Sequence, residues 1–148
     1  MNPIERFEGE YAFLSNFYPA PVEMWGQLYP SVEAAYQAAK CANADDRLQF
    51  QNDRLPAGGA KKLGREVEIR SDWDDVKFGI MERLVARKFE IPVLQRRLLE
   101  TDDAKLVEGN YWGDTTWGVD LKTGKGENRL GIILTVVRCT IREANANL

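Results

Sequence analysis

SVEAAYQAAKCA, residues 31–42, is the stretch that decides what kind of fold this chain adopts. Its first residue, a serine, is a typical helix N-cap, and alanine is the strongest helix former. Four polar side chains in it follow the spacing i, i+3, i+4 and i+7, so a helix places them on one face. They are Glu33, Tyr36, Gln37 and Lys40. A solvated polar face is the simpler interpretation. The alternative is that a carboxylate, an amide and an amine line one pocket.

Short elements are predicted on both sides of this helix. Upstream, residues 21–31 alternate around Trp25-Gly26, a pattern typical of a short β-hairpin. Downstream, residues 44–53 predict a short helix. Pro56 predicts the start of another helix, which continues to Glu66.

The C-terminal half predicts three more helices. Asp72 is the expected cap of the longest helix, about residues 73–89. Pro92 ends it and starts a helix over residues 93–100. Residues 130–141, LGIILTVVRCTI, have the β-branched content of a strand, but their apolar side chains keep helical spacing, so we predict a helix. The fold class is therefore α+β, predominantly helical with a small β-sheet or hairpin, in a single domain over residues 1–148.

Composition narrows the chemistry. The chain has 148 residues, 44% hydrophobic and 29% charged, as expected for one globular domain. It has no histidine, which excludes Ser-His-Asp and Cys-His nucleophiles and leaves Asp, Glu, Lys, Tyr or water for acid–base chemistry. The net charge of -3 argues against coating nucleic acid by bulk electrostatics. No apolar stretch reaches membrane-spanning length and the start lacks a secretory signal, so we expect a cytoplasmic protein.

We expect the sulfur-containing residues to lie in the core rather than to form a redox or metal site. Cys41 and Cys139 form no CxxC pair, and we expect two buried, reduced thiols. Met24 and Met81 are also expected in the core.

Two segments carry cations that suit a phosphate. The glycine-rich loop of residues 113–128 matches neither a Walker motif nor GxGxxG, but it brings Lys125 and Arg129 to an expected helix N-terminus. An ordinary flexible loop is the alternative. Residues 61–65 gather Lys61, Lys62 and Arg65, either as phosphate ligands or as a solvated basic face.

Aromatic side chains accompany these cations. Trp73 is either a core residue or a platform on which a base stacks. Around Asp114 the chain places Tyr111, Trp112 and Trp117, which predict either a ligand wall or a loop anchored by buried rings.

Several stretches, in this order along the chain, resemble the NADAR family, also called YbiA-like. They are LSNFYP (14–19), VEAAYQAAK (32–40), KKLGR (61–65), SDWDDVKFGIM (71–81), KLVEGNYWGD (105–114) and GKGENRLGIIL (124–134). The resemblance implies a helical α+β fold and N-glycosidase chemistry. It implies hydrolysis of phosphoribosylamino-pyrimidine intermediates of riboflavin synthesis, or removal of ADP-ribose from guanine in nucleic acid.

The resemblance also implies roles for individual residues. The family's catalytic glutamate corresponds to Glu33, its helix lysine to Lys40, its tryptophan to Trp73 and its loop aspartate to Asp114. The carboxylates would stabilise positive charge on the sugar and orient water. Lys40 could instead form a Schiff base with the opened sugar if burial lowers its pKa.

The remaining candidates are substrate-binding residues: Asn16, Phe17, Tyr36, Gln37, Lys61, Arg65, Trp112, Gly113, Lys125, Asn128 and Arg129. We expect a small phosphorylated ribosyl substrate, no cofactor and no metal. ADP-ribosylated nucleic acid is the alternative partner, and a binding module for NAD-like or ADP-ribose ligands without turnover is the alternative from another class.

Overall fold

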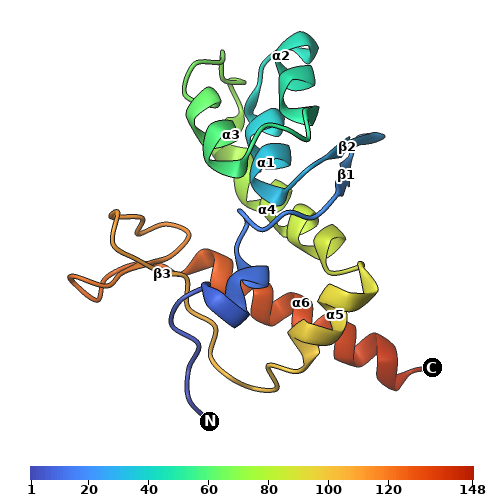
Figure 1. Cartoon of the computed structure of the whole chain (residues 1–148), viewed down its shortest axis with the longest axis vertical. Coiled ribbons are helices and arrows are strands. Elements are labelled where there is room, and N and C mark those ends of the chain that lie inside the picture. The colour runs from blue at the N-terminus through green and yellow to red at the C-terminus, as the bar shows by residue number, and fades with distance from the viewer. The chain divides into compact units, whose positions relative to one another are not determined.

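A computed structural model describes residues 1–148, which form two compact units (Figure 1). One unit is Asn16–Glu90, and the other combines Met1–Ser15 with Ile91–Leu148. The structure confirms the predicted α+β, predominantly helical class. No helix combines the length and the hydropathy needed to cross a bilayer.

The Asn16–Glu90 unit holds the predicted hairpin and the polar helix. Strands β1 (Val22–Met24) and β2 (Gln27–Tyr29) pair antiparallel, with Trp25 and Gly26 in the turn. Helix α1 (Val32–Lys40) begins as predicted, because the Ser31 side chain accepts the Ala34 N–H at 3.1 Å. Its alanines are fully buried, which lets neighbouring helices approach closely.

Three helical segments follow in the same unit. They are α2 (Ala44–Leu48), the 3-10 turn η2 (Gln49–Gln51) and α3 (Ala57–Leu63). The last of them ends earlier than predicted, and Pro56 is its N-cap rather than its first residue. Arg65 consequently lies beyond the end of the helix and is exposed.

Helix α4 (Trp73–Lys88) closes the unit and packs against α1. Asp72 is its N-cap residue, but its carboxylate makes no capping bond, because it accepts two hydrogen bonds from the Arg70 guanidinium instead. The buried side of α4 includes Ile80 and Leu84, as the spacing predicts. It also buries Lys88, which the sequence did not single out.

The second unit is built on two helices and a few short backbone pairings. Helix α5 (Pro92–Leu99) starts at the predicted proline and packs on α6 (Arg129–Ala146). The prediction that residues 73–89 form the longest helix was wrong, since α6 is longer, with 18 residues against 16 in α4. The predicted helix over 130–141 is confirmed.

The remaining segments of this unit surround the glycine-rich loop. The 3-10 helix η1 (Gly9–Leu14) contributes Phe13 and Leu14 to the core. Strands β3 (Gly109–Asn110) and β4 (Val119–Asp120) form a parallel pair, so the loop over 113–128 contains a strand that the sequence did not predict.

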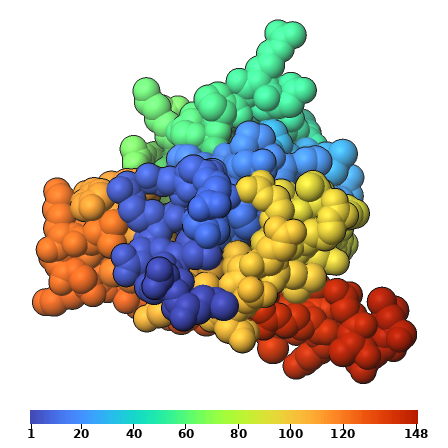
Figure 2. Space-filling model, turned by 60° about the horizontal axis from the view of Figure 1, so that its bottom comes forward, coloured from blue at the N-terminus to red at the C-terminus, as the bar shows by residue number.

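Of the four sulfur-containing residues that were predicted to lie in the core, three are buried and one is exposed. Cys41, Met24 and Met81 are buried, as predicted. Cys139 is exposed, so its prediction was wrong. It lies in the C-terminal half of α6, where residues from Glu143 onward are also exposed and form part of the red surface in Figure 2. Arg138, the residue before Cys139, is buried, so only one side of this stretch is covered, and helical spacing alone did not reveal which side that is.

Candidate active site

Glu33 is a buried carboxylate in the first turn of α1, with 7% of its surface exposed. Its backbone N–H donates to the carbonyl of Asn16 at 3.1 Å, and Gln37 Nε2 donates to Glu33 Oε1 at 2.9 Å. Tyr36 and Gln37 on the same helix face are buried as well. The interpretation of this face as solvated was therefore wrong.

Gln37 is held against the end of α3. Its side chain is as buried as that of Glu33, and its Oε1 has no hydrogen-bond partner. A Cβ built on Gly64 would lie 1.9 Å from that oxygen and 2.6 Å from Gln37 Cδ. Only glycine leaves room for the amide in this position. The packing of Gly64 thus fixes the group that donates to Glu33.

Lys40 lies seven residues after Glu33 on the same helix and is half-buried. Burial lowers the pKa of Lys40 below its ordinary value of 10.5, and the charge of Arg65 lowers it further. Cys41 and Glu33 act in the opposite direction. The unit thus brings a carboxylate, an amine with a lowered pKa and a guanidinium into electrostatic range of one another.

Aromatic rings flank this polar group. The rings of Tyr36 and Trp73 are tilted by 53° with centroids 4.9 Å apart, and both residues are buried. Phe17 is exposed, and the Lys61 Nζ lies 5.9 Å from its ring centroid. The Asn16 amide donates to Met81 Sδ at 3.4 Å. A sulfur is a weak acceptor, so this amide is held in place by a bond that a better partner can replace.

Asp114 belongs to the other unit, where it shapes its own loop. Its Oδ1 accepts the backbone N–H groups of Thr116 at 3.0 Å and Trp117 at 2.9 Å. Its backbone is held in turn by Asn110, which has no exposed surface and bonds both the N–H and the carbonyl of Asp114. The sequence did not single out Asn110, although a fully buried amide organises the whole loop.

The other loop candidates differ in how far they are fixed. Asn128 has φ 53° and caps α6, and its side chain accepts the Glu108 N–H and donates to the Leu106 carbonyl. Arg129 forms an ion pair with Glu127 at 3.2 Å. Trp112 is 64% exposed, so the alternative of a loop anchored by buried rings does not apply to it. Lys125 is exposed, and Gly113 has φ 82°.

The model of the NADAR domain matches residues 5–142, nearly the whole length of the chain. This chain belongs to the NADAR family. The match runs through both units and includes every residue predicted for the site.

Individual NADAR proteins agree with this assignment. The chain is 35% identical over 132 residues to the N-glycosidase YbiA of Escherichia coli, which covers 87% of this chain and 81% of that protein. An N-glycosidase of Nostoc punctiforme is 34% identical, covering 89% of this chain and 86% of the relative. A riboflavin biosynthesis protein of Vibrio vulnificus is 38% identical over 95% of this chain, which spans only 39% of that protein's length.

A solved structure gives the same result for the fold. The NMR structure of the E. coli protein YbiA superposes with a TM-score of 0.85 at 30% identity, covering 100% of this chain and 90% of YbiA. The NADAR fold predicted from the sequence motifs is therefore confirmed. The site residues carried over from the family remain predictions.

Proposed function

We propose that this NADAR chain is an N-glycosidase that hydrolyses the ribosyl C–N bond of phosphoribosylamino-pyrimidine intermediates of riboflavin synthesis. The observation that carries the proposal is the buried Glu33 carboxylate, which is held by Gln37 and lies on the same helix face as an amine of lowered pKa. The N-glycosidase names of the E. coli and Nostoc relatives and the riboflavin name of the Vibrio relative support it.

Cleavage of a ribosyl C–N bond develops positive charge on C1 and the ring oxygen of the sugar. Glu33 stabilises this charge because its carboxylate is already desolvated and fixed, so it does not reorganise during the reaction. Water attacks C1, the departing nitrogen takes a proton, and the products are ribose 5-phosphate and an aminopyrimidine. Asp114 is the proposed second carboxylate of the reaction.

Lys40 offers a covalent route to the same products. A lowered pKa increases the fraction of neutral amine, the form that attacks a carbonyl carbon. In this route Nζ adds to C1 of the opened sugar and displaces the aminopyrimidine, leaving an imine. Water then hydrolyses the imine, which regenerates Lys40 and releases ribose 5-phosphate.

The other candidate residues are proposed to bind substrate. Trp73, packed on Tyr36, offers a ring for stacking on the base. Asn16 is proposed to bind the sugar or base, since its carbonyl accepts the Glu33 N–H at the start of α1, and Phe17 follows it in the chain. The proposed phosphate ligands are Lys61, Arg65, Lys125 and Arg129. Trp112, Gly113 and Asn128, which belong to the same unit as Asp114, are also proposed to bind substrate.

The test compares Glu33→Gln with wild type in an assay for ribose 5-phosphate release. The amide keeps the shape of the side chain and removes its charge, so we expect kcat to fall by about 100-fold or more. Glu66→Gln is the matched control, since Glu66 is exposed in the same unit. A Glu33→Gln enzyme within a few-fold of wild type would refute the assignment. A parallel incubation with ADP-ribosylated DNA tests the rival substrate, and release of ADP-ribose from that DNA, without hydrolysis of the pyrimidine substrate, would favour it.

A further inference from the structure

Trp25 occupies a backbone position that suits it poorly. It has φ 53° and the following Gly26 has φ 79°, as a two-residue hairpin turn of type I′ requires. Asn, Asp or Gly normally fills the first of these positions, and a bulky side chain there is a genuine outlier. Trp25 is nevertheless 52% exposed, so burial in a core does not explain its presence. Strained residues of this kind concentrate at ligand sites.

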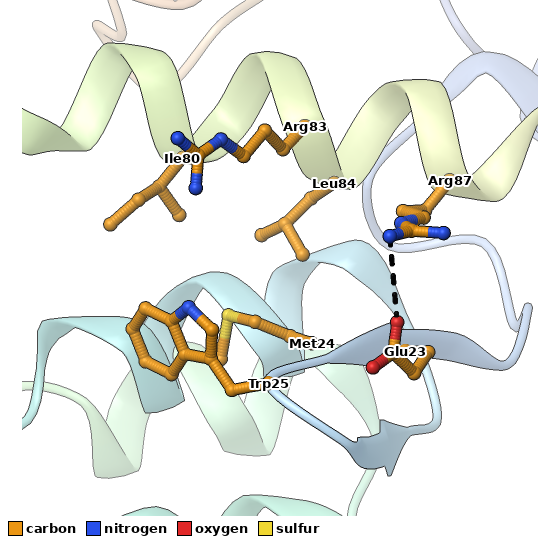
Figure 3. A pocket seen from close by; sticks show the side chains of 7 residues that line it. All are labelled: Glu23, Met24, Trp25, Ile80, Arg83, Leu84 and Arg87. Carbon is orange, nitrogen blue, oxygen red and sulfur yellow. Dashed lines mark ion pairs between the residues drawn. The ribbon is translucent and has the colours of Figure 1, made fainter.

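The indole of Trp25 forms one wall of a cavity of about 280 Å³ between the hairpin and α4. Figure 3 shows Met24 and Trp25 projecting from the hairpin toward Ile80 and Leu84 of α4. The floor is therefore apolar. None of the residues that line the cavity belongs to the proposed catalytic site.

Two arginines of α4 give the cavity a cationic rim. Arg87 forms ion pairs with Glu23 at 3.8 Å and with Glu90 at 3.7 Å, and the first of these is drawn in Figure 3. Arg83 has no hydrogen-bond or ion-pair partner. A guanidinium with all its donors available, beside an apolar wall, is suited to bind an oxyanion in two-point geometry.

Two further arginines hold the indole from outside the cavity. The guanidinium carbons of Arg47 and Arg70 lie 5.1 Å and 5.9 Å from its ring centroid. Both are tethered, Arg47 to the Cys41 carbonyl at 3.0 Å and Arg70 to the carboxylate of Asp72. Cation–π contacts of this kind stabilise the observed position of the indole, and a pre-positioned ring loses less entropy when a ligand stacks on it.

We propose that this cavity binds a small ligand with a planar ring and a phosphate, of the nucleoside monophosphate class. The ring stacks on Trp25, and the phosphate accepts hydrogen bonds from Arg83. The volume is too small for a peptide helix but accommodates a single base with its sugar phosphate at the rim. This site is separate from the proposed hydrolysis, so its failure would leave the N-glycosidase proposal intact.

The test is a titration with uridine 5′-monophosphate followed through the indole N–H resonances of the four tryptophans, assigned with Trp→Phe variants. We expect a saturable shift of the Trp25 resonance. If the Trp25 resonance stays in place, or if only the Trp73 resonance moves, the proposal is wrong.

Variants separate the two halves of the ligand. Arg83→Gln is expected to weaken binding of the nucleotide about 10-fold or more, because one charge-assisted contact is lost. It should leave the weaker binding of uridine unchanged. Arg54→Gln removes the same charge from an exposed site elsewhere in the unit and should bind like wild type. Equal nucleotide affinity of Arg83→Gln and wild type would overturn the phosphate contact.

Trp25→Asn tests the stacking wall without endangering the fold. Asn-Gly is the preferred pair in a type I′ turn, so we expect cooperative unfolding to be retained. Binding of uridine 5′-monophosphate should be lost, and hydrolysis of the ribosyl substrate should remain. A Trp25→Asn protein that binds the nucleotide as tightly as wild type would contradict the proposal.

Discussion

Replacing Gly64 by alanine is expected to impair catalysis while leaving the fold nearly as stable as before. Gly64 has φ -61° and ψ -16°, so its backbone accepts alanine without strain. The added Cβ would lie 1.9 Å from Gln37 Oε1 and 3.2 Å from Gln37 Cγ, which forces the amide to move. The Gln37 side chain then no longer donates to Glu33 over 2.9 Å.

The magnitudes of the two effects differ. A hydrogen bond to a charged group contributes about 1.5–3 kcal/mol, so kcat should fall about 10- to 150-fold. Moving one side chain out of its preferred rotamer costs about 0.5–1.5 kcal/mol, and the replacement of glycine at a helix end offsets part of that. The melting temperature should therefore stay within about 4 °C of wild type.

The assay is a double-mutant cycle on kcat with Gly64→Ala, Gln37→Ala and the combination. If Gly64 acts only through Gln37, the double variant should be no slower than Gln37→Ala. Gly58→Ala is the control, because Gly58 lies in α3, the helix that ends just before Gly64, with open space around its Cβ position. A Gly64→Ala enzyme with wild-type kcat would refute the reasoning. So would a double variant whose loss equals the product of the single losses.

Three further predictions use other features of the structure. Borohydride added during turnover should reduce the imine on Lys40 and so attach the sugar covalently to wild-type protein, but not to Lys40→Met. Mass spectrometry detects the added mass, and a wild-type protein without it would exclude the imine route. Asp114→Asn keeps the Oδ1 atom that accepts the N–H groups of Thr116 and Trp117, so the free energy of unfolding should change by less than about 1 kcal/mol. The same variant should have a lower kcat, and an unchanged kcat would leave Asp114 with a structural role alone. Burial lowers the pKa of Lys88 from 10.5 to about 7, so protons leave the native state before the unfolded state, and stability should rise between pH 7 and 10. Urea titrations at several pH values should show a rise of at most about 1.4 kcal/mol per pH unit in wild type and no such rise in Lys88→Met. If stability depends on pH in the same way in both proteins, the lowered pKa of Lys88 is contradicted.

Local signals in the sequence determined most of the elements. Ser31 caps α1, Trp25-Gly26 turns the hairpin and Pro92 starts α5, as predicted. Each of these predictions depends on backbone preferences within a few residues, which no distant contact reverses here. The ambiguous segment 130–141 was also resolved by its own spacing, since its apolar residues repeat with the helical period.

Features that depend on neighbours from elsewhere in the chain could not be predicted in the same way. Helical spacing brought Glu33, Gln37 and Lys40 to one face, but it did not reveal whether that face meets water. Gly64, some thirty positions away, removes the space around Gln37, and that contact exists only after folding. The exposure of Cys139 and the burial of Lys88 are of the same kind.

The sequence by itself therefore determined the helices, the hairpin and the chemical identity of the side chains on the α1 face. Only the tertiary structure decided that this face is desolvated, which holds the Gln37 amide against Glu33 and lowers the pKa of Lys40. The physical reason is that backbone conformation follows from local steric preferences, whereas the exclusion of water from a side chain requires atoms supplied by distant parts of the chain.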